Sequence, residues 1–346
     1  MVADLDAEIE RYRAAIKTNP DDAEAHENLG LAYGLKGQYD EAIVQLKEAV
    51  RLSPGSVDAR FSLGLAYDAT GDMEDAVKEY REVIRLAPDL KDARLALAVS
   101  LVDIGLAEDA LPEFRELLKL DPDNVTAYVG FGLALSSAGY LDDAIEMFRE
   151  AVKRQPKHFD AHMFLGGAYA DKGELVEAVR EYRAAIDIGP DNPDAYYNLA
   201  VTLSDKGQIG EAIEKYRQAL QLDPDSLEAR YNLGLLLDEK GLLDEAIKEF
   251  EETLRVEPTF ADGHNRIGIA LARKGDDKKA MEAFGKAIEL DPGYSEPHFN
   301  LGALYFDQGR YDDAIAEFEA ALKIDPDYAE AHDRLVIAKD KKQKKY

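Results

Sequence analysis

The sequence predicts an all-α protein built from a repeated pair of helices, and two punctuating residues support this prediction. Prolines recur every 34 residues from Pro20 to Pro326, and glycines recur at the same interval from Gly37 to Gly309. Proline ends a helix because it lacks an N–H and clashes with the preceding turn. Glycine readily takes the left-handed backbone that closes a helix C-terminus. Each period therefore predicts a first helix, a glycine turn, a second helix and a proline-containing turn.

The segment 295–328 shows the repeated unit in full, and it reads SEPHFNLGALYFDQGRYDDAIAEFEAALKIDPDY. Both halves place apolar residues at helical spacing, so each half predicts an amphipathic helix. A small residue near the start of the second helix would let the two helices approach closely. An alanine fills this place in every full repeat, at Ala42, Ala76, Ala110, Ala144, Ala178, Ala212, Ala246, Ala280 and Ala314.

This pattern resembles the tetratricopeptide repeat (TPR), whose consensus is W-x2-L-G-x2-Y, then A-x3-F, then P. In 295–328 the consensus positions hold His298, Leu301, Gly302, Tyr305, Ala314, Phe318 and Pro326, so that only the tryptophan is missing. The glycine departs twice along the chain, at Ala98 and Ala200. The resemblance covers essentially the whole chain and implies a right-handed superhelical solenoid of antiparallel helix pairs.

The repeat also predicts how the chain is divided. Residues 1–22 match the second helix of a repeat, nine full repeats fill 23–328, and 329–346 form a final capping helix with a basic end. Each unit buries its apolar face only on its neighbours, so we expect one continuous solenoid. Repeat 91–124 is the least regular, and Pro112 in its second helix predicts a small local distortion. Position 1 of each successive first helix is residue 23, 57, 91, 125, 159, 193, 227, 261, 295 or 329.

Composition excludes several classes of function. The net charge is −28, from 70 acidic and 42 basic residues, so nucleic acid is a poor partner. The chain has no cysteine, which excludes disulfides and thiolate chemistry. No apolar run approaches the roughly 18–20 residues of a membrane span, and the N-terminus lacks the features of a signal peptide. The simplest interpretation is a cytoplasmic protein, although a mature chain whose leader had been removed would look the same.

No residue pattern indicates catalysis or metal binding, and we expect neither an enzyme nor a cofactor. P-loop, dinucleotide, nucleophile-elbow and zincin motifs are all missing. Equivalent positions of neighbouring repeats are roughly 8–10 Å apart, whereas nitrogens sharing one zinc each lie about 2.0–2.1 Å from it. We therefore interpret as packing residues the five histidines at position 4, which are His26, His162, His264, His298 and His332.

The informative positions are those that, in the family, face the concave surface: positions 2, 5, 9, 12 and 13 of the first helix. Apolar residues dominate positions 5 and 9, and position 2 is acidic in nine of ten helices. The resemblance thus implies a groove that binds a protein or peptide segment of basic and apolar character. The candidate ligand-binding residues are Phe61, Leu95, Val129, Met163, Tyr197, Asn198, Tyr231, Asn232, Arg266, Arg273, Phe299, Asn300 and Arg334.

Structural interpretations compete with this one. The acids at position 2 are close to capping-box spacing, as in Asp21 and Glu24, and they also favour the helix dipole. The apolar residues at position 9 could pack between neighbouring helices, and Arg266 could pair with Asp262. Two functions stay open: a scaffold or adaptor that binds other proteins, and a structural protein that assembles with itself through its ends. Weak self-association is expected at these ends, where Val336 lies in the last helix.

Overall fold

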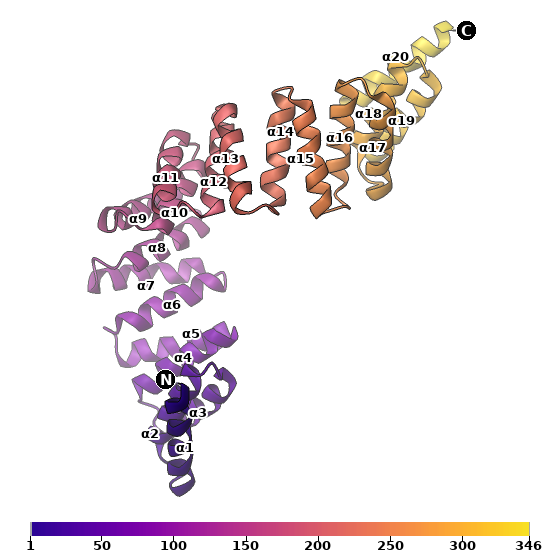
Figure 1. Cartoon of the computed structure of the whole chain (residues 1–346). Coiled ribbons are helices and arrows are strands. Elements are labelled where there is room, and N and C mark those ends of the chain that lie inside the picture. Colours follow the sequence, from indigo (N-terminus) through magenta and orange to yellow (C-terminus); the bar gives the residue numbers. More distant parts are fainter. Residues whose placement is uncertain (1, 346) are drawn as a thin grey trace. The chain divides into compact units, whose positions relative to one another are not determined.

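The computed structural model describes residues 2–345 and the side chains of residues 5–344, and within this range the chain forms twenty α-helices (Figure 1). It divides into two compact units, Met1–Ile188 and Gly189–Tyr346. The first unit holds α1 (Val2–Thr18), α2 (Ala23–Leu35), α3 (Tyr39–Leu52), α4 (Val57–Thr70), α5 (Met73–Leu86), α6 (Lys91–Asp103), α7 (Ala107–Leu120), α8 (Val125–Ser137), α9 (Leu141–Arg154), α10 (Phe159–Asp171) and α11 (Leu175–Ile188). The second unit holds α12 (Pro193–Asp205), α13 (Ile209–Leu222), α14 (Leu227–Glu239), α15 (Leu243–Val256), α16 (Ala261–Arg273), α17 (Asp277–Leu290), α18 (Ser295–Asp307), α19 (Tyr311–Ile324) and α20 (Ala329–Lys345).

Within each unit every helix packs against the helix that follows it, which confirms the predicted all-α array of helix pairs. The turns follow the sequence signals. All nine repeat glycines, from Gly37 to Gly309, have φ values between 71° and 85°. Around Gly71, for example, its N–H donates to the Asp68 carbonyl at 3.1 Å and the next N–H donates to the Tyr67 carbonyl at 2.9 Å. These bonds cap the last carbonyls of α4 and reverse the chain into α5.

The contact between the two helices of a pair depends on small residues. All nine repeat alanines, from Ala42 to Ala314, are completely buried. At position 8, Gly30 faces the side chain of Leu46 and the other glycines face an aromatic ring of the second helix, so closely that a Cβ would clash. A Cβ at Gly64 would lie 2.4 Å from Cε1 of Tyr80, and a Cβ at Gly302 would lie 2.8 Å from Cε1 of Phe318.

Repeat 91–124 has Ala98 in place of this glycine. Its buried aromatic residue, Phe114, lies against Gly130 of the following repeat, where a Cβ would approach Cζ of Phe114 to 2.7 Å. The Phe114 ring also stacks on Phe131 at 5.9 Å. Pro112 is accommodated as well, because α7 runs unbroken through it and has the same length as α5 and α9. No helix among residues 2–345 is long and apolar enough to cross a bilayer.

Candidate functional site

The position-4 histidines make structural hydrogen bonds. Nδ1 of His26 lies 2.8 Å from Oε1 of Gln45, and Nε2 lies 3.1 Å from the Pro20 carbonyl oxygen. His162 repeats this arrangement with Glu181 at 2.8 Å and the Pro156 carbonyl at 3.1 Å. Both ring nitrogens are therefore engaged in these two residues. Within the described residues, no cluster of His, Asp and Glu side chains is arranged to hold a metal ion.

Arginines make the same connection in other repeats, which the sequence interpretation missed. Nε of Arg60 donates to the Pro54 carbonyl at 2.9 Å, and Nη1 pairs with Glu79 at 2.6 Å. Arg94 pairs with Glu113 at 2.6 Å in the same way. In these repeats the side chain at position 4 thus links a first helix to the proline turn before it and to the second helix of its own repeat. The missed signal was an acid or amide 19 residues after the donor.

In the first unit, the candidates at position 5 belong partly to the core. Phe61 on α4 is half-buried, and its ring centroid lies 5.8 Å from that of Tyr80 on α5. Leu95 on α6 and Met163 on α10 are also half-buried, and Val129 on α8 is buried. These side chains therefore offer a ligand only part of their surface.

Position 9 is more exposed than position 5 at one end of this unit. Leu31 on α2, Leu65 on α4 and Val99 on α6 are 40%, 47% and 41% exposed. These three side chains are therefore only partly covered by packing, and we call them the apolar strip. Single exposed leucines are common on protein surfaces, but a row of exposed apolar side chains on the first helices of three consecutive repeats is typical of an interaction surface.

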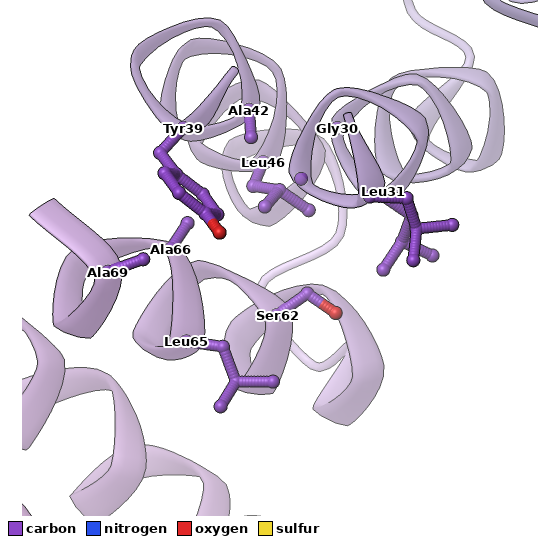
Figure 2. A pocket seen from close by; sticks show the side chains of 11 residues that line it. Gly30, Leu31, Tyr39, Ala42, Leu46, Ser62, Leu65, Ala66 and Ala69 are labelled. Carbon is purple, nitrogen blue, oxygen red and sulfur yellow. The ribbon is translucent and has the colours of Figure 1, made fainter. Parts of the chain in front are cut away.

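A hollow of about 320 Å³ lies between two members of the apolar strip. Figure 2 shows how α2, α3 and α4 contribute side chains to it, with Tyr39, Leu31 and Leu65 around small residues. The small residues leave the space, and Leu35 adds a further exposed apolar side chain at the rim. The complete lining is Gly30, Leu31, Gly34, Leu35, Tyr39, Ala42, Leu46, Ser62, Leu65, Ala66 and Ala69.

Acidic residues accompany the apolar strip at position 2. The N-cap of α2 is Asp22, whose side chain accepts from the Ala25 N–H at 3.0 Å. Glu24 is then the second residue of the helix, so the capping-box interpretation with Asp21 is wrong, and the helix-dipole effect remains. None of the ion pairs found among the described residues involves Glu24, Asp58 or Asp92.

In the second unit, the candidate residues form a hydrogen-bond network that crosses from repeat to repeat. The Tyr231 hydroxyl donates to Asp262, and burial together with this bond raises the pKa of Tyr231 to about 12. Asp262 Oδ1 also lies 2.5 Å from the Tyr294 hydroxyl. Nε of Arg266 lies 3.4 Å from Asp262 Oδ1, which confirms the predicted pairing of these two residues. Asn265, completely buried, donates to the Tyr294 hydroxyl at 3.0 Å.

The network extends through the asparagines at position 6. Asn300 donates to Oδ1 of Asn265 at 3.0 Å, and Asn232 donates to the Tyr197 hydroxyl at 3.3 Å. These amides therefore already bond to side chains of the neighbouring repeat, and they help to hold the first helices together. Next to the network, a hollow of about 660 Å³ is lined by Phe260, Tyr294 and several acidic side chains.

The remaining candidates of the second unit vary in exposure. Arg273 is exposed and bonds to the Asp238 carbonyl at 3.1 Å. The guanidinium carbon of Arg334, also exposed, lies 5.8 Å from the ring centroid of Phe306. Phe299 is half-buried with its ring 5.8 Å from Phe318, and Asn198 on α12 is half-buried as well. The structure thus places these residues on the first helices or on α20, without gathering all of them into one pocket.

Comparison with solved structures supports the fold. The C-terminal part of a TPR repeat-containing protein from Cytophaga hutchinsonii is 20% identical over 70% of this chain and 99% of that chain, with a TM-score of 0.62. YrrB, described as a TPR protein with an unusual peptide-binding site, is 28% identical over 52% of this chain and 92% of that chain, with a TM-score of 0.48. MamA from Desulfovibrio magneticus RS-1 is 25% identical over 48% of this chain and 94% of that chain, with a TM-score of 0.47. No curated protein matches the chain.

Family models cover nearly the whole chain. A model described as tetratricopeptide repeat matches residues 36–91, 95–146, 129–193 and 241–295, which together exceed half of the sequence. Further TPR models match residues 4–37 and 202–241, residues 271–336 and residues 181–214. All of these models describe repeats rather than catalytic domains. Their matches run through both units and contain the helix pairs described above, and the chain therefore belongs to the tetratricopeptide repeat family.

Proposed function

We propose that the chain is a non-enzymatic scaffold or adaptor that binds a segment of another protein. The observation that carries this proposal is the apolar strip with its hollow between α2 and α4. Tetratricopeptide repeat proteins generally act by binding other proteins, and this surface offers what such binding needs. A hollow lined by glycines and alanines accepts one bulky apolar side chain, while the exposed leucines cover it.

The partner that suits this surface has apolar anchors and basic residues. Burying a leucine-sized side chain contributes about 1.5–3 kcal/mol, which corresponds to roughly tenfold or more in affinity for each anchor. Lys or Arg side chains of the partner would meet the acids at position 2. The first unit has 37 acidic and 21 basic residues, so its net charge of −16 also attracts a basic segment. Binding should weaken with added salt because exposed charges are screened.

We propose that the candidate residues of the second unit also contact a bound segment, through polar groups rather than through an exposed apolar row. Tyr197 and Tyr231 are half-buried, and Asn198 and Asn232 stand beside them at position 6. Phenol and amide groups can hydrogen-bond the backbone of a bound segment. Replacing both tyrosines with alanine should weaken binding of a partner that uses this unit, whereas a partner held only by the first unit should be unaffected.

Selection of random peptides on the full chain tests the proposal. We expect enrichment of peptides that combine apolar residues with Lys or Arg. Their affinity should fall about tenfold for Leu31→Gln or Leu65→Gln, which remove the apolar surface without adding charge. Val44→Gln is the matched control, since Val44 on α3 is 61% exposed and does not line the hollow. Selected peptides that bind all three variants equally would contradict the proposal.

A second candidate function is assembly of the protein with itself, and exposed residues of α20 favour it. Val336 and Ile337 are both exposed and lie side by side in the sequence. A lysine of the same helix, Lys339, is already paired with Glu319 at 2.8 Å. Light scattering should then show a mass that rises with concentration and returns to the monomer in Val336→Gln/Ile337→Gln. A constant monomer mass in the unaltered protein would exclude this function.

A further inference from the structure

We infer that the apolar strip binds an extended segment in which an apolar side chain recurs at every third residue, with basic residues between. This inference rests on the proposed function and specifies the register and conformation of the partner. It combines three observations: an exposed apolar residue at position 9 of three first helices, the narrowness of this row, and the acids beside it, which make no ion pair found among the described residues.

The spacing of the strip sets the period of its ligand. Leu31, Leu65 and Val99 occupy the same position in three consecutive repeats, and packed helices lie roughly 8–10 Å apart. An extended chain of polyproline II type rises about 3.1 Å per residue and completes a turn in three residues. Its residues i, i+3 and i+6 therefore face one side at about 9 Å intervals. Every third side chain of such a segment can then contact one residue of the apolar strip.

The width of the strip favours an extended segment over a helical one. A helix could match the spacing with residues i and i+7, which are about 10.5 Å apart, but it is roughly 10–12 Å across. Its apolar stripe would need a second apolar row to cover it. The neighbouring position 5 offers Glu27 on α2 and half-buried Phe61 and Leu95. Apart from Leu35, which lies one turn beyond Leu31 on α2, the exposed apolar surface of these three helices is thus close to single file, and a narrow extended chain covers it better.

The charges beside the strip explain why the intervening residues should be basic. Position 2 precedes position 9 by seven residues, so both lie on the same face of a helix, two turns apart. Glu24, Asp58 and Asp92 form this acidic row, and none of them takes part in an ion pair found among the described residues. The nearby arginines cannot neutralise the row, because Arg60 and Arg94 are held by Glu79 and Glu113 at 2.6 Å.

Two synthetic peptides of identical composition test the inference on the full chain. One consists of four Leu-Lys-Ser triplets, and the other places the same twelve residues so that leucines stand first, fifth, eighth and twelfth, as on one face of a helix. Fluorescence anisotropy of labelled peptides measures both affinities. We expect the triplet peptide to bind at least about tenfold more tightly. Leu65→Gln should remove most of this advantage, and Val44→Gln should preserve it.

The outcomes separate the inference from the proposed function. If the helix-ordered peptide binds as tightly as the triplet peptide or more so, and Leu65→Gln weakens it, the strip binds segments but the extended register is wrong. If neither peptide responds to Leu31→Gln or Leu65→Gln, while peptides selected at random do respond, the register is again wrong and the proposed function stands. If selected peptides also fail to respond, both the inference and the proposed function are wrong.

Discussion

Gly64 offers the sharpest test of how each helix pair is packed. A Cβ at this position would lie 2.4, 2.8 and 2.9 Å from Cε1, Cδ1 and Cζ of Tyr80. Tyr80 is completely buried, and its hydroxyl donates to Asp68 at 2.5 Å. The ring therefore cannot move aside without weakening this bond. Gly64→Ala should accordingly strain the interior of α4 and α5.

The magnitude follows from three effects. Overpacking a core costs about 1–3 kcal/mol, and a weakened hydrogen bond adds about 0.5–1.5 kcal/mol. The higher helix propensity of alanine offsets up to about 1 kcal/mol. We therefore expect Gly64→Ala to lower the free energy of unfolding by about 0.5–4.5 kcal/mol, measured by urea denaturation with far-UV circular dichroism.

A glycine inside the first helix of the preceding repeat provides the control. Gly34 lies inside α2, and a Cβ there would have no heavy atom within 4 Å. Gly34→Ala should therefore stabilise the protein by up to about 1 kcal/mol through helix propensity alone. Opposite signs for the two substitutions are the expected result. Equal effects at Gly34 and Gly64 would refute the close contact with Tyr80 as the reason for glycine at position 8.

Three further predictions concern single side chains. Hydrogen bonding to Glu181 raises the pKa of His162, so its stabilising contribution should be complete below about pH 6.5 and be lost as the pH rises through the raised pKa. Burial lowers the pKa of His264, so a loss of stability should instead appear as the pH falls below about 6.5. NMR titration of the His162 and His264 imidazoles measures both pKa values, and equal values would contradict the two opposite shifts. Tyr231→Phe should destabilise the protein by about 1–3 kcal/mol in urea, because the half-buried Asp262 loses a hydrogen-bond donor, and an unchanged midpoint would show that this bond contributes nothing.

Much of the fold could be predicted from the sequence because its signals are local. Gly37 and its equivalents fix a left-handed turn by themselves, and the prolines end helices without reference to distant residues. Because the repeat covers nearly the whole chain, all the helix pairs could be predicted from a single unit. Packing contacts between neighbouring repeats could not be predicted in this way. The position of Phe114 against Gly130 could not be predicted, because it depends on how two neighbouring repeats pack together.

The location of the binding site stays a prediction, and several details of the candidate surface could not be predicted. The sequence pointed to the first helices, and the three residues of the apolar strip lie there. It gave most weight to position 5, whereas the ring of Phe61 packs on Tyr80 and the side chains of Leu31 and Leu65 are more exposed. The hollow arises only when small residues from three helices meet around Tyr39. Such a meeting depends on the packing of helices, and no periodic pattern in one helix reveals it.

The most direct measurement of the central claim is NMR of methyl-labelled leucine and valine side chains during titration with a peptide selected on the full chain. Leu31, Leu65 and Val99 form the apolar strip, and Val44 lies outside it. We predict that the methyl signals of the three strip residues shift with increasing peptide, while those of Val44 stay in place. Shifts confined to methyl groups outside the strip, with those of Leu31 and Leu65 unchanged, would contradict the assignment of this surface as the binding site.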